Sequence, residues 1–453
     1  MNATKKCSFI LYALLLFLLA NCGGKKTLQG VFQKQTPYQR YAAKLKQADL
    51  DKTALGEAWL QAGQKALTDS ITITLPFKET GYFAADNPKA LSYRIAAQRG
   101  ERIVISLEVK ARETMQLFID LFEAPGSPTE EPDLVASADT TGIFLSYEVE
   151  DDLPHIVRVQ PELLRSGQYT ITIQAEPTLA FPVPGKTSRN IDSVWGDPRD
   201  GGARRHEGVD IFAKRGTPAL AAAPGIVTRV SITPIGGKVV WVSDLHRGQN
   251  LYYAHLDSQL VQPGQRVQVG DTLGLIGNTG NAITTKPHLH FGIYRSGHGA
   301  TNPYPYLREE TAPVPPIKVA ANVLGNWVRV SAQTAHVRLQ PSTGSAIYHT
   351  LPRNTPLLVT GATADWYKVL LPNNSEAYIA ARLVEAVTRP VTYVQLPVET
   401  ALLEAAHPGA AAKESIAAGN KVAVLGTYSQ YELVRNEAGE VGWIDAPKAA
   451  EAR

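Results

Sequence analysis

Histidine and carboxylate side chains stand at a metal-binding spacing near the middle of the chain. His206 and Asp210 lie four residues apart, and Gly208 between them should let the backbone bend so that both side chains reach one point. Zinc accepts imidazole nitrogen and carboxylate oxygen at about 2.0 to 2.2 Å. The segment 206–210 therefore predicts two ligands of a single metal site.

Two further segments carry histidines that could complete such a site. His288 and His290 flank Leu289, and residues i and i+2 of a β-strand point to the same face, so both imidazoles should enter one pocket. His255 ends another strand-like run, in which alternation places it on the same face as Tyr253. In such a group one imidazole can bind metal while another transfers protons.

The elements that position these residues should be mainly β-strands. The chain has 453 residues, which is long enough for several domains, and 36 Gly with 30 Pro favour short strands joined by tight turns. The formal net charge is only +3, with Lys and Arg scattered along the chain. A nucleic-acid partner is not expected, because the basic stripe that such a partner requires is missing.

The N-terminus predicts secretion and a lipid anchor. Lys5 and Lys6 precede an apolar run, 9–20, that is too short to span a bilayer, as in a signal peptide. The run ends at Cys22 in a sequence that resembles the lipobox of bacterial lipoproteins, which implies acylation of Cys22 and removal of residues before it. Asn21 departs from the usual small residue, so ordinary secretion is the alternative. Either way, we expect a cell-envelope location outside the cytoplasm, with the lipid anchoring the protein to the membrane.

Composition and periodicity divide the rest of the chain into modules. Apolar residues at helical spacing predict a helical tether within 23–69, and six alternating runs between 70 and 176 predict a β-sandwich. This sandwich resembles the jelly-roll-like domains that accompany secreted peptidases. A peptidase domain is expected at 185–310, followed by a Pro-rich linker at 311–320.

Two small barrels are expected at the C-terminal end. The segment 321–386 resembles bacterial SH3-like domains through its Ala335-His336-Val337-Arg338 and Asp365-Trp366-Tyr367-Lys368-Val369 motifs. The segment 390–449 repeats this outline in a more degenerate form.

Several motifs between residues 205 and 302 resemble the lysostaphin- and LytM-type zinc metallopeptidases. They are His206-Glu207-Gly208-Val209-Asp210, Gly216-Thr217-Pro218, Tyr253-Ala254-His255-Leu256, Gly277-Asn278-Thr279-Gly280 and Pro287-His288-Leu289-His290-Phe291. The resemblance implies one zinc ion per chain, bound by His206, Asp210 and His290. It also implies that His255 and His288 are catalytic, with their individual roles open. Three protein ligands leave a fourth position for water, which is typical of a catalytic zinc site.

Two departures from that family pattern concern the surroundings of the site. The segment 281–286 is longer than the usual link before Pro287, and Gly292 replaces a commonly acidic residue. These changes leave the ligand set intact and affect the expected loop shape and substrate preference.

The resemblance implies a zinc-dependent endopeptidase that cuts stem or cross-bridge peptides of peptidoglycan. The alternative is a non-catalytic or autoinhibited wall-binding scaffold that regulates other wall hydrolases. Loss of any of the three expected ligands would have favoured the scaffold, and none is lost.

Overall fold

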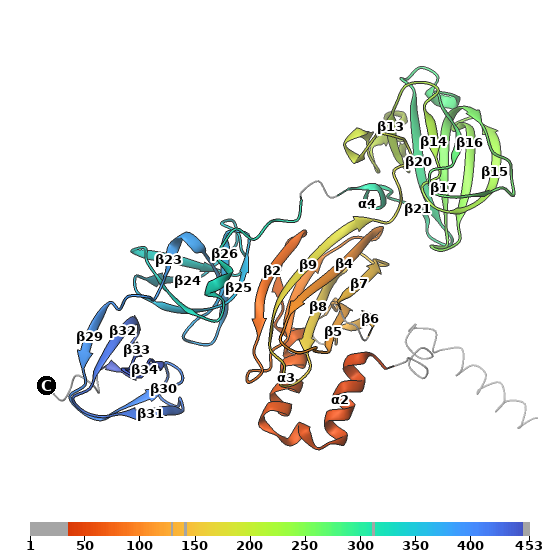
Figure 1. The fold of residues 1–453 in the computed structure, drawn as a ribbon. Coiled ribbons are helices and arrows are strands. Elements are labelled where there is room, and N and C mark those ends of the chain that lie inside the picture. The colour runs from red at the N-terminus through yellow and green to blue at the C-terminus, as the bar shows by residue number, and fades with distance from the viewer. Residues whose placement is uncertain (1–34, 128–129, 140–142, 310–312, 447–453) are drawn as a thin grey trace, which may run out of the picture.

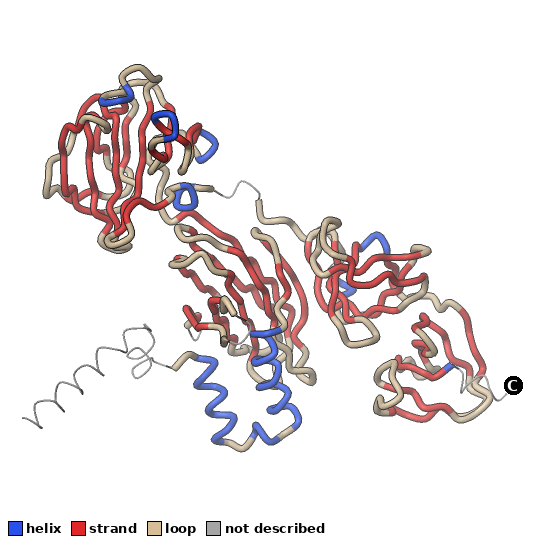
Figure 2. The backbone as a smooth tube through the Cα atoms, turned by 180° about the vertical axis from the view of Figure 1, so that it is seen from behind, coloured by secondary structure: helices blue, strands red, loops and turns tan. Residues whose placement is uncertain are grey.

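The computed structural model describes residues 35–127, 130–139, 143–309 and 313–446, most of which form β-sheets (Figures 1 and 2). The prediction of a mainly β chain with several sheets is confirmed. The expected signal peptide and Cys22 lie outside the described residues. Within the described ranges, no helix is both long and apolar enough to cross a membrane.

Two helices precede the first sheet and pack against it. Helix α2 spans Pro37–Gln47 and α3 spans Ala54–Thr68, with a 3-10 turn at Leu50–Lys52 between them. Thr36 begins α2, because its hydroxyl accepts a hydrogen bond from the Gln39 amide at 3.1 Å. Trp59 on α3 is buried and donates to the carbonyl of Pro161 at 2.8 Å. The predicted helical region is thus fixed to the sandwich that follows.

Two sheets then face each other around one apolar core, as the sandwich prediction requires. The first sheet has the order β1 (Ile71–Thr72), β3 (Leu91–Ala96), β8 (Pro154–Pro161), β5 (Leu117–Glu123) and β6 (Asp133–Ser137). The second runs through β2 (Phe77–Phe83), β9 (Gly167–Pro177), β4 (Glu101–Lys110) and β7 (Phe144–Glu148). Ile103 and Ile171 from one sheet meet Ile119 and Val157 from the other in this core.

The second sheet of the sandwich continues into the first C-terminal barrel. Strand β2 pairs with β25 (Pro356–Thr363) through Thr80 opposite Ala362 and Gly81 opposite Gly361. The other strands of this barrel are β22 (Trp327–Val330), β23 (Thr334–Arg338), β24 (Ile347–Pro352), β26 (Trp366–Leu370), β27 (Glu376–Ala380) and β28 (Val384–Ala386). Sandwich and barrel therefore share backbone hydrogen bonds.

The last six strands form a separate sheet at the C-terminal end (Figure 1). In spatial order they are β29 (Thr392–Gln395), β32 (Lys421–Tyr428), β33 (Tyr431–Arg435), β34 (Val441–Asp445), β30 (Thr400–Leu403) and β31 (Ala412–Ile416). Trp443 is 2% exposed and fills its interior.

A ten-stranded sheet contains the predicted site residues. Its main path is β10 (Ile191–Ser193), β13 (Val209–Phe212), β20 (His288–Arg295), β17 (Gln249–Gln259), β16 (Gly237–Asp244), β15 (Gly225–Thr233) and β18 (Arg266–Val267). Three short strands join this path, namely β14 (Pro218–Leu220), β19 (Thr272–Ile276) and β21 (Gly299–Thr301). A separate hairpin consists of β11 (Pro198–Arg199) and β12 (Arg204–Arg205), and a short helix, α4, spans Tyr304–Leu307.

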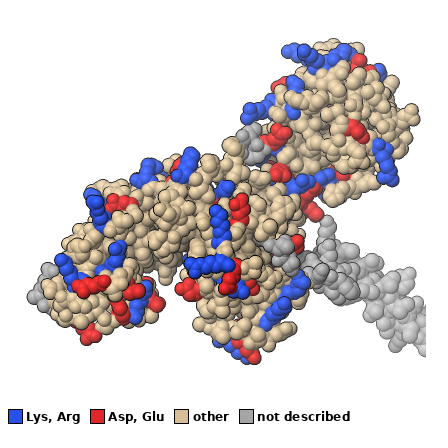
Figure 3. Space-filling view, in the orientation of Figure 1, with Lys and Arg blue, Asp and Glu red and all other residues tan. Residues whose placement is uncertain are grey.

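One face of this sheet covers the core and the other carries the polar residues. Leu289, Phe291, Leu251 and Tyr253 are fully buried in the core. Because side chains alternate along a strand, the even-numbered residues of β20 point to the opposite face. On the molecular face shown in Figure 3, acidic and basic side chains are interspersed.

Candidate metal centre

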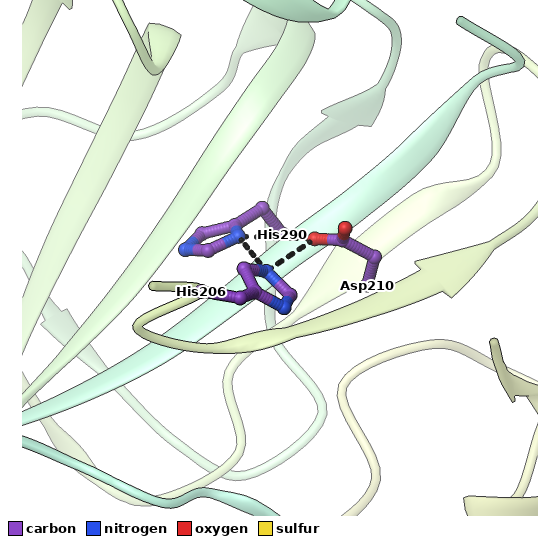
Figure 4. Close-up of side chains that lie close together, drawn as sticks. All are labelled: His206, Asp210 and His290. Atoms are coloured by element: carbon purple, nitrogen blue, oxygen red, sulfur yellow. Dashed lines mark hydrogen bonds and ion pairs between the residues drawn. The ribbon is translucent and has the colours of Figure 1, made fainter. Parts of the chain in front are cut away.

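Strand pairing brings two of the predicted ligands side by side. Strands β13 and β20 are antiparallel, with Asp210 directly opposite His290. Directly opposed residues of an antiparallel pair project to the same face, so the carboxylate and the imidazole converge. His206 reaches them from the turn that leads into β13 (Figure 4).

The three candidate ligand atoms form a nearly regular triangle (Figure 4). His206 Nε2 lies 3.0 Å from Asp210 Oδ1 and 2.9 Å from His290 Nδ1, and His290 Nδ1 lies 3.0 Å from Asp210 Oδ1. Among the described residues, this is a group whose spacing could hold a metal ion. Two nitrogens and one carboxylate oxygen suit zinc, and one ion can lie about 2.0 to 2.2 Å from three atoms so spaced. The residues present therefore fit the metal that the sequence predicts.

The absence of a side chain at Gly208 allows the ligand-bearing turn to pack closely on β20. A Cβ atom there would lie 2.6 Å from the carbonyl oxygen of Phe291 and 2.7 Å from the His290 ring. The glycine thus allows the 206–210 turn to approach β20 closely. The sequence predicted that this glycine permits bending, whereas the feature that the structure shows is the close approach.

The charge state of Asp210 suits a ligand. Burial raises the pKa of its carboxyl, but hydrogen bonds with His206 and His290 outweigh burial and hold the pKa far below its ordinary value. Burial lowers the pKa of His290 and, together with the neighbouring His206 and His288, outweighs the hydrogen bond and charge of Asp210, which raise it. Asp210 is therefore an anion and His290 a neutral imidazole near pH 7, which are the forms that bind metal.

The two predicted catalytic histidines lie beside this triangle. The His288 ring centroid is 4.9 Å from that of His255, and the His255 ring is 5.9 Å from that of His290. His288 Nδ1 is 2.8 Å from the carbonyl oxygen of Lys286, and His255 Nδ1 is 2.9 Å from that of Thr279. A carbonyl only accepts hydrogen bonds, so each Nδ1 is the donor, and in the neutral form of either imidazole Nε2 carries the lone pair.

His255 reaches the site by a route that differs from the prediction. Alternation was expected to place it on the same face as Tyr253, but Tyr253 is fully buried in the core. At His255 the backbone adopts a left-handed conformation, φ 60°, where the pairing of β17 shifts from β20 to β19. This irregularity turns the imidazole to the face of His288 and His290, so the expectation for Tyr253 and His255 was wrong.

Burial keeps His255 neutral. Its pKa is lowered to about 4, first by burial and then by the neighbouring His290 and His288. At neutral pH its Nε2 can therefore accept a proton, as a general base must.

Several residues around the site were not predicted from sequence. Arg199 on β11 donates from Nη2 to Asp210 Oδ2 at 2.7 Å. Trp241, Tyr252 and Tyr294 form an aromatic cluster on the site face, with the Tyr252 ring 5.8 Å from that of His290. Arg199, Trp241 and Tyr252 have no sequence spacing that links them to the ligands, because they come from other strands. Tyr294 lies four residues after His290 on β20, so strand alternation could have predicted its place on the site face.

The long segment before Pro287 lies at the rim of the site. Asn278 donates from its side chain to the carbonyls of Ile283 and Thr285 at 3.1 and 3.2 Å. The Asn281 amide donates to the carbonyl of Ile235, which belongs to the β15–β16 turn. Ile283 is 72% exposed, so this loop presents an apolar side chain to solvent.

Two segments of the chain match known protein families. Residues 204–303 match peptidase family M23, and residues 333–385 match the bacterial SH3 domain. The chain is 37% identical over 141 residues to an L-Ala–D-Glu endopeptidase of Bacillus subtilis, covering 28% of this chain and 43% of that protein. It is 38% identical over 115 residues to peptidoglycan DD-endopeptidase ShyC of Vibrio cholerae, covering 25% of each.

Among solved structures, the catalytic domain of lysostaphin from Staphylococcus simulans is 28% identical, with a TM-score of 0.24. That alignment covers 26% of this chain and 93% of the lysostaphin domain. The chain spans less than half the length of the curated relatives named above. The segment 204–303, which matches peptidase family M23, is called the M23 domain below, and the segment 333–385, which matches the bacterial SH3 domain, is called the SH3 domain.

Proposed function

We propose that this protein is a zinc-dependent endopeptidase that hydrolyses peptide bonds in the stem or cross-bridge peptides of peptidoglycan. The observation that carries the proposal is the convergence of two histidines, each anchored through its Nδ1, on the His206, Asp210 and His290 triangle. Relatives of the M23 domain whose names specify peptidoglycan endopeptidases support the substrate class.

The reaction needs a polarised carbonyl, an activated water and a proton for the leaving amine. Zinc in such a site supplies Lewis acidity, which polarises the peptide carbonyl and acidifies water. His255 and His288 are placed to accept the proton of the attacking water and to return it to the amine nitrogen. The hydrogen bonds from their Nδ1 atoms to backbone carbonyls hold both rings with Nε2 available.

The alternative, a wall-binding scaffold, predicts a different result when the protein is mixed with peptidoglycan. A regulator would bind wall without releasing fragments, whereas an autoinhibited enzyme would release them only after the sandwich is removed. The complete set of ligand and proton-transfer side chains favours the enzyme, because a regulator does not need His255 and His288 beside the ligands.

Digestion of purified peptidoglycan tests the proposal. The mature protein should release soluble muropeptides, and a chelator or His290→Ala should abolish the release. His246→Ala is the matched control, because His246 is exposed on the turn between β16 and β17 and should retain full activity. Release that persists in both the chelated protein and His290→Ala would exclude the zinc mechanism.

We further propose that Cys22 carries a lipid that anchors the protein to the cell envelope outside the cytoplasm. The proposal rests on the lipobox-like sequence before Cys22. Expression with a labelled fatty acid should label the wild type and leave Cys22→Ser unlabelled. Equal labelling of both proteins would contradict acylation at this cysteine.

A further inference from the structure

The hairpin β11–β12 supplies a guanidinium group to the outer side of the metal centre. Arg199 Nη2 lies 2.7 Å from Asp210 Oδ2 and 2.7 Å from Ser193 Oγ. Both bonds leave from the same nitrogen, which carries two hydrogens. Arg199 therefore ties a metal ligand to the segment that precedes the M23 domain.

The two oxygens of Asp210 have separate partners. Oδ1 faces His206 Nε2 and His290 Nδ1, each at 3.0 Å, and belongs to the ligand triangle. Oδ2 is bound by Arg199 and points away from that triangle. A charge-assisted hydrogen bond to one oxygen opposes rotation of the carboxylate, so it disfavours binding of an ion by both oxygens.

The same segment also fixes His206. Its Nδ1 lies 2.9 Å from the carbonyl of Val194 and 3.3 Å from Ser193 Oγ. Ser193 in turn donates to Asp197 Oδ2 at 2.8 Å. Arg199 and its neighbours thus form one hydrogen-bonded layer behind two of the three ligands.

We propose that Arg199 is a positioning residue, which holds Asp210 as a one-oxygen metal ligand and thereby raises the affinity of the site for a divalent cation. The inference rests on the proposed function only in assuming that the triangle binds zinc. Outer partners of metal ligands commonly contribute about tenfold to hundredfold in affinity.

If Arg199 acted mainly through its positive charge, its removal would change zinc affinity in the opposite direction. Arg199 is a cation near the site, so its removal would strengthen binding of a divalent cation if repulsion were its main influence. If orientation of Asp210 dominates, removal weakens binding. The direction of the change in zinc affinity therefore separates the two roles.

Zinc titration of the full mature protein against a chromophoric chelator tests the inference without any activity assay. Arg199→Met should lose about tenfold to hundredfold in zinc affinity. Arg199→Lys should restore most of it, because an ammonium can donate to Asp210 and Ser193 from one nitrogen. Arg205→Met is the matched control: it removes an exposed arginine from the partner strand of the same hairpin and should bind zinc as the wild type does.

Substitution with cobalt gives a second readout. The visible absorption of the wild-type cobalt protein should be intense, as for a four-coordinate site. Arg199→Met should weaken this absorption, because a rotating carboxylate adds a fifth donor atom. Arg199→Lys should return it toward the wild-type intensity, which a merely structural role would not predict.

The outcomes separate the two proposals. Unchanged or tighter zinc binding by Arg199→Met would overturn the positioning role while leaving the proposed function in place. A wild type that binds no zinc would refute the proposed metal mechanism itself. The Arg199 side chain is 32% exposed, so Arg199→Met should fold, as thermal unfolding of the metal-free proteins will show. If it does not, Arg199→Gln, which is too short to reach Asp210, replaces it in the same titration.

Discussion

The backbone of His255 decides where its imidazole points. Its left-handed φ is unusual for a residue other than glycine, and its amide donates to the carbonyl of Gly236 at 2.8 Å. Strand β17 therefore stops alternating at this residue, and the side chain joins the site instead of the core. A single backbone conformation thus places one of the two histidines that are predicted to transfer protons.

We expect His255→Asn to lose activity without losing metal. Asparagine tolerates the left-handed conformation better than most residues, so the bulge should persist. Without the imidazole, kcat should fall by about 100-fold to 10,000-fold, whereas zinc affinity should not change. Kinetics on purified wall and zinc titration measure the two quantities, with His246→Asn as the exposed control. A variant with wild-type kcat would remove His255 from the mechanism.

Sequence reasoning was most effective where local geometry is regular. The placement of His288 and His290 on one face followed from strand alternation, and Asp210 opposite His290 extends that regularity across β13 and β20. It failed at His255, because a bulge reverses the alternation. It also missed Arg199, since a contact between a hairpin and a strand leaves no periodic pattern in the sequence. The assignment of ligand and catalytic roles to these residues stays a prediction.

At the scale of secondary structure, strand β2 carries a buried carboxylate that joins two domains. Glu79 is fully buried, and its oxygens accept hydrogen bonds from Tyr93 at 2.7 Å, Tyr169 at 3.1 Å and Tyr378 at 2.9 Å. Tyr93 and Tyr169 belong to the sandwich, whereas Tyr378 belongs to the SH3 domain. Lys368 Nζ lies 3.8 Å away and partly balances the charge.

We expect Glu79→Ala to destabilise the joint between the sandwich and the SH3 domain. Removing one partner of a buried charged network costs about 3–5 kcal/mol, because the three tyrosine hydroxyls lose their common acceptor. Tyr378→Phe removes a single hydrogen bond to a charged group and should cost about 1.5–3 kcal/mol. Urea unfolding measures the free energy of unfolding of each variant, and hydrogen exchange shows whether the amides of β2 and β25 lose protection. Equal losses in the two variants would show that Glu79 does not organise the network.

Only some strands of the sandwich could be predicted from the sequence. The alternating runs of β3, β4, β5, β7 and β9 were predicted, because each has apolar residues on one face. Strand β8 was missed since it begins and ends in proline, and β2 was missed since Gly81 and charged residues interrupt its pattern. Strand β6 was also missed. Strands β2 and β8 are central in their sheets, where long-range pairing outweighs local composition.

At the scale of the whole molecule, an ionic contact connects the sandwich to the M23 domain. Arg247, on the turn after β16, donates to both oxygens of Glu148 on β7 at 2.8 and 2.9 Å. Arg102 donates to the same carboxylate at 2.8 Å. Burial raises the pKa of Glu148, but the hydrogen bonds from Arg247 and Arg102 outweigh burial and lower it.

The pH dependence of this contact follows from the lowered pKa. A carboxyl whose pKa is lower in the folded state stabilises that state fully above its unfolded pKa, about 4.3 for Glu, and ceases to do so as the pH falls through the folded value. Glu148→Gln should therefore lower the thermal midpoint at pH 7, and the two proteins should converge as the pH falls below 4.3. Differential scanning calorimetry from pH 7 to below pH 4.3 measures the difference in thermal midpoint between the two proteins. A difference in thermal midpoint that stays constant with pH would exclude the ion pair as its cause.

The arrangement of the domains was beyond sequence reasoning. The modules were predicted from composition and motifs, but nothing in Thr80 or Gly81 indicates that they pair with residues near position 361. Such pairings are long-range contacts between domains, which leave no local pattern in the sequence.

The pairing of β2 with β25 has a consequence for proteolytic processing. The Pro-rich stretch 313–316 contains exposed residues between the M23 domain and the SH3 domain, where a protease could cut the chain. Yet the two fragments would still share a sheet and the Glu79 network, so they would migrate together under native conditions and separate only in denaturant. A cut that severs the polypeptide here would leave the sandwich and the SH3 domain joined.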